Sequence, residues 1–219
     1  LERKEVAVRA RAHQNDVNAV TFVDDSGHVL LSGSDDCCIK AWDTRVMTTA
    51  VGCLVGHRGG ITCLSSRHDG RYAISNGKDQ VLKLWDLRGM VSAGDKSVRA
   101  ATSQRAGDYR WMEPDVAGAQ RPTGFKDVSV GDFTGHRVLQ TLIRCYFSPE
   151  HTTGQRYIIS GSHDGRVRIW DSVTGGVVRQ LAYHREIVRD VAWHPFLPLV
   201  TSSSWDGRIG LFRYGAASE

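Results

Sequence analysis

The stretch that decides the fold is residues 30–43, which read LLSGSDDCCIKAWD. Three later stretches of the same length repeat its pattern: AISNGKDQVLKLWD at 73–86, IISGSHDGRVRIWD at 158–171 and VTSSSWDGRIGLFR at 200–213. In every copy a Ser lies ten residues before the aromatic residue near the end, an Asp lies six residues before it, and a His precedes the whole stretch. The chain therefore contains four copies of one unit, and internal repeats of this kind must be interpreted before anything else.

Each unit reads as a small antiparallel sheet. In the first copy a turn at Ser26-Gly27 precedes the apolar run 28–33, and a second turn at Asp35-Asp36 leads into the alternating run 38–42. Two short runs around a tight turn predict a β-hairpin. The same pattern predicts strands at 72–75, 157–161 and 199–202. Because one small sheet cannot bury both faces, we expect the sheets to stack around an axis with the aromatic residues between them.

The spacing of the units points to a particular architecture. Trp42 and Trp85 are 43 residues apart, and Trp170 and Phe212 are 42 residues apart. A period of about 40–45 residues that opens with Gly-His and closes with Trp-Asp is typical of the four-stranded blades of a β-propeller. The sequence therefore predicts an all-β propeller with four blades of antiparallel sheet.

The dipeptides at the two ends of the unit carry a family resemblance. Gly-His stands at 56–57 and 135–136, and Trp-Asp stands at 42–43, 85–86 and 170–171. With these motifs the chain resembles the WD40 repeat family over almost its whole length. Ala12 and Tyr183 depart from the Gly of the pattern, and Phe212-Arg213 replaces the last Trp-Asp. The resemblance implies a WD40 β-propeller, and we expect these blades to be the C-terminal part of a seven-bladed ring with about three blades missing from the front.

The resemblance also implies a role for the repeated polar residues. In WD40 proteins they are joined by hydrogen bonds inside each blade, with the Trp indole donating at one end. The four expected sets are His13, Ser32, Asp36 and Trp42; His57, Ser75, Asp79 and Trp85; His136, Ser160, Asp164 and Trp170; and His184, Ser202, Asp206 and Phe212. A hydrolase triad would need a single constellation with an activated hydroxyl and an oxyanion hole. Four copies indicate networks that stabilise the blades instead.

The repeats set the expected boundaries. Residues 1–12 read as the outer strand of a preceding blade, and the four blades follow at 13–56, 57–135, 136–183 and 184–219. From Trp85 to His136 the chain runs for 51 residues, whereas Trp42 and His57 are 15 residues apart. We therefore expect an insertion at about 89–126, between the last two strands of the second blade, with 127–131 resuming its outer strand.

The insertion has a loop-like composition, and loops of this length are usually functional or disordered. A partly mobile segment is expected at 93–106. The aromatic cluster at 109–114, YRWMEP, is the exception to the loop-like composition. It either fastens the loop to the side of the propeller or contacts a partner.

Composition excludes several classes of function. The formal charge of +4 is too small to argue for nucleic-acid binding, and no apolar run is long enough to span a membrane. Five Cys without a Cys-x-x-Cys motif favour a reducing compartment, so we expect the nucleus and cytoplasm. With no metal-spaced His and Cys, phosphate loop or isolated acid pair, the sequence predicts no cofactor, no metal and no enzyme.

A second motif suggests a function. Trp42-Asp43-Thr44-Arg45 and Trp85-Asp86-Leu87-Arg88 are Trp-Asp-x-Arg boxes in adjacent blades, whereas residues 170–173 lack the Arg. Tandem boxes resemble those of the cullin-4-associated factors, the WD40 substrate receptors of cullin-4 RING ubiquitin ligases, and most of all their factor 11 branch. The resemblance implies that Arg45 and Arg88, with Asp43 and Asp86, dock on the bottom face to the ligase's propeller adaptor, and through it to cullin-4. In the alternative interpretation each Arg merely pairs with a neighbouring Asp.

Protein substrates would then bind the opposite, top face. In this family the residues just before the Asp of each network and at the start of the innermost strand crowd the top rim. Here these are Asp35, Lys78, His163 and Trp205, with Asn18, Thr62 and Arg189. Trp beside Arg is typical of binding hot spots, so Trp205 and Arg189 are the first candidates, unless Trp205 covers a blade junction. Two other functions remain open: a WD40 scaffold of a chromatin or RNA-processing complex, and a nucleic-acid-binding propeller.

Overall fold

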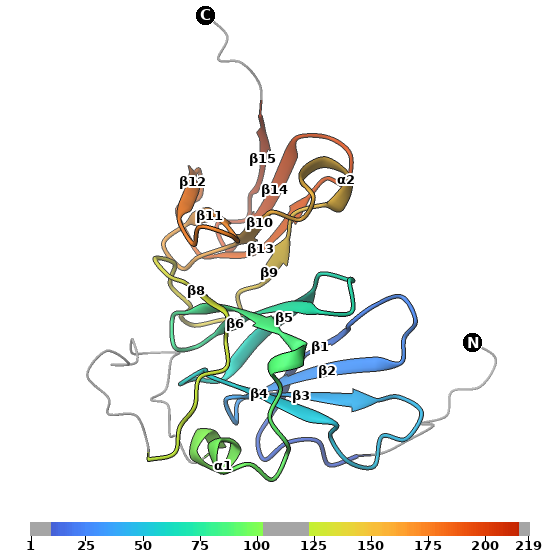
Figure 1. Ribbon diagram of the computed structural model, residues 1–219. Coiled ribbons are helices and arrows are strands. Elements are labelled where there is room, and N and C mark those ends of the chain that lie inside the picture. Colours follow the sequence, from blue (N-terminus) through green and yellow to red (C-terminus); the bar gives the residue numbers. More distant parts are fainter. Residues whose placement is uncertain (1–9, 103–122, 215–219) are drawn as a thin grey trace, which may run out of the picture.

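Four small antiparallel sheets follow one another along the described residues, 10–102 and 123–214, of the computed structural model (Figure 1). The first contains β1 (Val17–Phe22), β2 (Val29–Ser34), β3 (Cys38–Asp43) and β4 (Gly52–Val55). The second contains β5 (Ile61–Ser66), β6 (Tyr72–Gly77), β7 (Leu82–Asp86) and β8 (Gly131–Phe133). The third contains β9 (Cys145–Phe147), β10 (Tyr157–Ser160), β11 (Arg166–Asp171) and β12 (Val177–Ala182), and the fourth β13 (Val188–Trp193), β14 (Leu199–Ser204) and β15 (Ile209–Arg213).

In every sheet the strands lie side by side in chain order. Among the described residues, three short helices lie between strands: η1 (Leu87–Gly89), α1 (Lys96–Thr102) and α2 (Glu150–Thr153). The prediction of an all-β protein built from repeated antiparallel sheets is confirmed. The strand expected within residues 1–12 falls mainly on residues 1–9, which lie outside the described residues.

The core lies between consecutive sheets. Leu31 and Ile39 of the first sheet pack with Ile61 and Trp85 of the second, and similar clusters join the second sheet to the third and the third to the fourth. Trp85 and Trp170 are fully buried at two of these junctions. Burying a large apolar side chain stabilises the fold by about 1.5–3 kcal/mol, so the repeated aromatic residue is a main source of cohesion between the blades.

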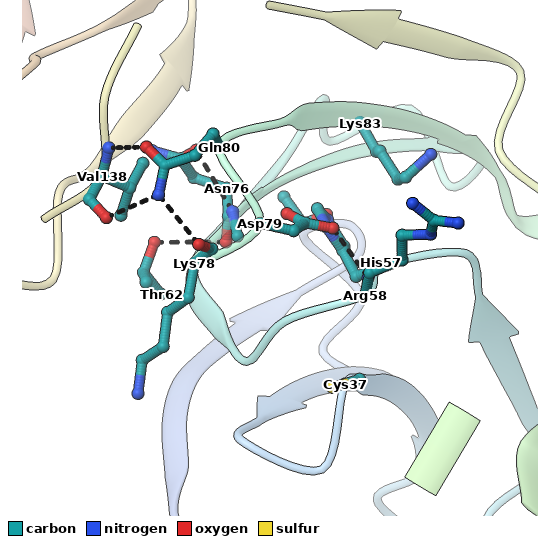
Figure 2. A network of polar contacts seen from close by, with 12 residues as sticks. Cys37, His57, Arg58, Thr62, Asn76, Lys78, Asp79, Gln80, Lys83 and Val138 are labelled. Carbon is teal, nitrogen blue, oxygen red and sulfur yellow. Dashed lines mark hydrogen bonds and ion pairs between the residues drawn. The ribbon is translucent and has the colours of Figure 1, made fainter. Parts of the chain in front are cut away.

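The turn between the second and third strands has the same backbone conformation at one residue in all four sheets, and in the second sheet that residue also makes a contact with the next blade. The residue after the repeated Asp has a left-handed φ at Cys37, Gln80, Gly165 and Gly207. Glycine adopts this conformation freely, whereas another residue costs about 1–2 kcal/mol. Gln80 has a compensating contact, because its Oε1 accepts from the Val138 amide at 2.6 Å and its Nε2 donates to the Val138 carbonyl at 3.0 Å (Figure 2). This turn therefore fastens the second sheet to the segment that leads into the third.

The insertion leaves the second sheet between β7 and β8, and it packs back on the first sheet (Figure 1). Val91 forms an isolated bridge with Cys53 on the free edge of β4, and the Val128 amide donates to the Val55 carbonyl at 2.9 Å. Residues 127–131 were expected to resume the outer strand. The ladder to β7 is formed by Gly131–Phe133, and the Val130 amide also donates to the Leu84 carbonyl at 2.8 Å, whereas Val128 bonds to β4.

Helix α1 covers the same edge of the first sheet. Val98 and Ala101 are buried against Cys38, Cys53 and Val55. A partly mobile segment was expected at 93–106, but residues 96–102 form this helix, and its two buried apolar residues pack on β3 and β4. The aromatic cluster at 109–114 lies outside the described residues.

Candidate protein interface

The expected polar network is complete in the first two sheets. In the second, Trp85 Nε1 donates to Ser75 Oγ at 2.8 Å, and Ser75 Oγ lies 2.7 Å from His57 Nε2. His57 Nδ1 lies 3.0 Å from the carboxylate of Asp79 (Figure 2). Because the carboxylate only accepts, Nδ1 carries the proton and the hydroxyl of Ser75 donates to Nε2. In the first sheet His13, Ser32, Asp36 and Trp42 make the same contacts, at 2.7–2.9 Å.

The fourth sheet keeps this network without its aromatic donor. His184 lies 2.8 Å from Ser202 Oγ and 3.1 Å from Asp206. Phe212 has no N–H group, so it contributes only packing, with the ring of Tyr183 set edge-on against it. The network of this sheet therefore ends at the Ser.

The third sheet departs from the prediction, and the expected set His136, Ser160, Asp164 and Trp170 does not join up. Asp164 Oδ1 accepts from Arg168 Nη1 at 3.0 Å, and the Trp170 indole donates to the carbonyl of Thr134 at 3.1 Å. Ser160 Oγ donates to the carbonyl of Arg144 at 3.1 Å. The prediction of a network here is wrong, because the buried guanidinium of Arg168 takes the carboxylate that His136 would have bound.

His136 finds its partner in the neighbouring sheet. Its Nε2 lies 2.7 Å from Oδ1 of Asn76, while Asn76 Nδ2 donates to the carbonyl of Ile143 at 3.2 Å. Because Oδ1 can only accept, Nε2 of His136 carries the proton, and Nδ1 has no partner among the described residues. Burial, with the charge of Arg168 acting in the same direction, lowers the pKa of His136 to about 4. This imidazole is therefore neutral and joins two blades.

The two Trp-Asp-x-Arg boxes have the same geometry. Arg45 donates from Nε and Nη2 to the two carboxylate oxygens of Asp43 at 2.9 and 2.7 Å. Arg88 donates in the same way to Asp86 at 3.1 and 2.7 Å. These hydrogen bonds hold the pKa of both carboxyl groups below the usual range of an aspartate. The pairing predicted by the alternative interpretation is thus present.

Both arginines also remain accessible. The side chains of Arg45 and Arg88 are 65% and 69% exposed. Each follows the end of the third strand of its sheet, so both lie on the face where these strands end, the bottom face. Arg71, which sequence analysis missed, donates from Nη2 to Asp86 at 3.1 Å, and its guanidinium lies 4.7 Å from the ring centroid of Tyr72. The pattern that could have revealed it is an Arg directly before the second strand.

At the opposite ends of the third strands, three of the predicted top-face residues meet. Lys78 Nζ lies 2.7 Å from Asp35, and Asn18 Nδ2 donates to the same carboxylate at 2.7 Å. Asn18 also donates to the carbonyl of Ile61 at 3.0 Å. These polar residues form a joint across the rim between the first two blades.

The remaining top-face residues are more scattered. Thr62 is buried, and its hydroxyl donates to the carbonyls of Asn76 and Ile143 at 3.2 Å, so its prediction as a contact for a target is wrong. His163 is half-buried. Arg189 is exposed and Trp205 is 54% exposed, and no ring contact joins the two among the described residues.

A β-bulge explains why the innermost strands differ at this rim. The register of the first two strands shifts around Asn18 in the first sheet, Thr62 in the second and Arg189 in the fourth. A bulge redirects one side chain out of the regular alternation. The position on the strand is therefore shared, but the local packing decides whether the side chain reaches solvent.

Nothing in the described part of the chain suggests a metal centre or a membrane helix. No group of three or more His, Cys, Asp or Glu residues there could hold a metal ion. No helix among the described residues combines the length and apolar character that crossing a membrane requires. All five cysteines are free and buried.

Repeated antiparallel sheets of three or four strands, two of them with a complete His–Ser–Asp–Trp network, define a WD40 propeller protein. The family model described as WD domain, G-beta repeat matches residues 5–43, 48–86, 127–171 and 175–213. The chain belongs to the WD40 repeat family, as predicted from its motifs.

Its relatives include named proteins of similar sequence. The LEC14B protein of Lithospermum erythrorhizon is 48% identical over 100% of this chain, which covers 46% of that relative. The DDB1- and CUL4-associated factor 11 homolog of Caenorhabditis briggsae is 41% identical over 100% of this chain and 40% of its own length. Its counterpart in Caenorhabditis elegans is 41% identical over 94% of this chain and 36% of its own length. The predicted resemblance to factor 11 is confirmed, and the chain spans less than half the length of these relatives.

The fold is also similar to that of solved structures. The computationally designed Ika4 protein aligns with a TM-score of 0.62 over 97% of this chain and 100% of its own, at 21% sequence identity. At this identity the likeness shows the fold alone.

Proposed function

We propose that this chain recognises protein substrates for a cullin-4 RING ubiquitin ligase. It contributes no catalytic group, and it raises the rate of ubiquitin transfer by holding the target close to the ligase. The relatives named DDB1- and CUL4-associated factor 11 homolog support this assignment, as does the family's use of propellers as binding platforms. The protein would act in the nucleus and cytoplasm.

The observation that carries the proposal is the pair of exposed arginines in adjacent blades, Arg45 and Arg88, each held by its own Asp. The bidentate pairing orders a long side chain before binding, which lowers the entropy lost when a partner engages it. It occupies Nε and Nη2, so each Nη1 can donate to an acceptor on the propeller adaptor, DDB1. The adaptor would in turn connect the chain to cullin-4.

The target would bind at the opposite ends of the same strands. Trp205 and Arg189 remain the main candidates, and the joint of Asp35, Lys78 and Asn18, with His163, would complete the surface. Because the turn at Asp35 precedes β3 and Arg45 follows it, the two surfaces lie at opposite ends of one strand. Adaptor and target can then be bound at once.

Affinity purification of the tagged protein from cells tests the proposal. Wild type, Arg45→Ala plus Arg88→Ala, and the matched surface control Arg166→Ala are compared for recovered DDB1 and cullin-4. We expect wild type and control to recover both proteins and the double variant to lose them while its thermal unfolding stays unchanged. If wild type recovers neither, the proposal fails, and the chain is a WD40 scaffold of another complex.

A further inference from the structure

The last residue of the third strand occupies one equivalent position in all four sheets. Asp43 pairs with Val29 and Asp86 with Tyr72, each opposite the first residue of the second strand. The same register pairs Asp171 with Tyr157 and Arg213 with Leu199. These four positions therefore recur on the bottom face, one in each blade.

In the third sheet an arginine binds the Asp at this position, although the sequence there lacks the Trp-Asp-x-Arg box. Residue 173 is Val, but Arg156 reaches Asp171 from the turn before β10, with Nε and Nη2 at 2.8 and 2.7 Å. Its side chain is 56% exposed. The guanidinium is bound through the same two nitrogens as those of Arg45 and Arg88, so its Nη1 is likewise not used by the aspartate.

Arg156 has an equivalent in the second sheet. The carbonyl of Arg156 accepts from the amide of Ser172, and the carbonyl of Arg71 accepts from the amide of Leu87, both at 2.9 Å. Arg71 and Arg156 therefore stand at the same place before the second strand. The second sheet holds both this arginine and the box arginine Arg88, whereas the third holds only Arg156.

The fourth sheet reverses the charge at the position. Arg213 stands where the other sheets have Asp, and it is exposed and makes no ion pair within the described part of the chain. Asp86 is shared by two arginines. At these equivalent positions guanidinium groups therefore outnumber carboxylates from the second blade to the fourth.

We propose that Arg45, Arg71, Arg88, Arg156 and Arg213, together the arginine row, form one docking surface for acidic side chains and carbonyl groups of the propeller adaptor. The inference rests on the proposed function and extends its contact beyond the two boxes to the third and fourth blades. In the third blade Arg156 takes the role that the box arginine has in the first two blades. The aspartates that bind these arginines, Asp43, Asp86 and Asp171, would repel a phosphate backbone. A protein with discrete acceptors therefore fits this surface better than a nucleic acid.

Binding of the purified chain to purified DDB1, measured by biolayer interferometry at two salt concentrations, tests the row. Arg156→Ala is expected to weaken binding about tenfold, and adding Arg213→Ala to weaken it further and to reduce its salt dependence. Arg166→Ala, which removes an exposed arginine outside the row, should leave the affinity unchanged.

A transplanted box separates a direct role of the guanidinium from a structural one. Val173 is 81% exposed, and its amide donates to Asp171 Oδ1 at 2.9 Å, as the Arg45 amide does to Asp43. Arg156→Ala plus Val173→Arg rebuilds a Trp-Asp-x-Arg box in the third blade and should restore most of the affinity. If Arg45→Ala plus Arg88→Ala abolishes binding but Arg156→Ala does not weaken it, the extension is overturned and the proposed function stands. If wild type does not bind DDB1, both are overturned.

Discussion

The amide oxygen of Asn76 in β6 accepts a hydrogen bond from His136 Nε2 at 2.7 Å, across the junction of the second and third blades. At the equivalent place in the first and third sheets stand Gly33 and Gly161, which have no side chain to offer. Asn76 therefore draws the His of the third repeat out of its own blade. In the other three sheets the repeated His bonds to the Ser of its own sheet, whereas His136 bonds to the neighbouring sheet and so holds two sheets together.

Replacing Asn76 with Ala should therefore be costly. His136 Nε2 is left without its buried partner, which costs about 1–3 kcal/mol, and the carbonyl of Ile143 loses one of its two donors but keeps the hydroxyl of Thr62. We expect the free energy of unfolding in urea to fall by about 2–4 kcal/mol. The control is Asn18→Ala, which also removes an inter-sheet bond but lies at the partly exposed rim, and there the loss should be below about 1 kcal/mol. Equal losses for the two variants would contradict the account.

The lowered pKa of His136 makes stability depend on pH in a defined window. The unfolded chain binds a proton at this residue near its ordinary value of 6.5, whereas the folded chain does so only near 4. The contribution of His136 to stability is then constant above about pH 6.5 and falls as the pH drops toward 4, by at most about 3 kcal/mol.

The measurement for this window is a comparison with His136→Gln, whose amide can still donate to Asn76 but does not titrate. Unfolding free energies of both proteins are determined from pH 7 to pH 4, so that the contributions of other groups cancel. The difference should move in favour of the variant by about 2–3 kcal/mol. Parallel curves would show that His136 does not resist protonation.

The two types of Ser in the repeat should respond differently to removal of the hydroxyl. Ser75→Ala leaves two buried nitrogens, in His57 and Trp85, without a partner and should cost about 2–3 kcal/mol. Ser160→Ala removes a donor to backbone carbonyls and should cost about 1 kcal/mol. Chemical denaturation of the two variants checks the order, and a larger loss at Ser160 would refute the broken network of the third blade.

The packing of helix α1 gives a prediction about the insertion. Val98→Asp places a carboxylate in the apolar site formed with Cys53 and Val55, so the helix should detach while the sheets stay folded. Hydrogen exchange should then accelerate at the amides of Cys53 and Val91, which bond to each other's carbonyls. Lys96→Asp, a matched change on the same helix outside the residues buried in that site, should leave their exchange unchanged.

The strands and three of the networks could be predicted because they depend on local spacing. Trp85 and Ser75, for example, lie on paired neighbouring strands, so a fixed separation in sequence brings them together. The third network could not be predicted, because other side chains bind two of its members. Arg168 binds the carboxylate of Asp164, and Asn76, which lies in another sheet, accepts from His136. Competition of this kind is set by packing and leaves no periodic signal.

The candidate site was only partly visible in the sequence for the same reason. The boxes were evident because Asp and Arg lie two residues apart, whereas Arg156 and Asp171 are 15 residues apart and meet only through the pairing of β10 with β11. Thr62 occupied the expected position on its strand, yet the neighbouring blade covers it. Sequence position located the rim, but which side chains face solvent depends on the next sheet.

The bond between the insertion and β4 has a consequence for how the protein is made. The open edge of the first sheet, at Cys53 and Val55, is completed by Val91 and Val128. A chain emerging from the ribosome therefore exposes this edge until residue 128 has been released, well after the first four strands have been synthesised. An uncovered strand edge recruits other strands, so pairing with the insertion removes a site at which the folded propeller could aggregate.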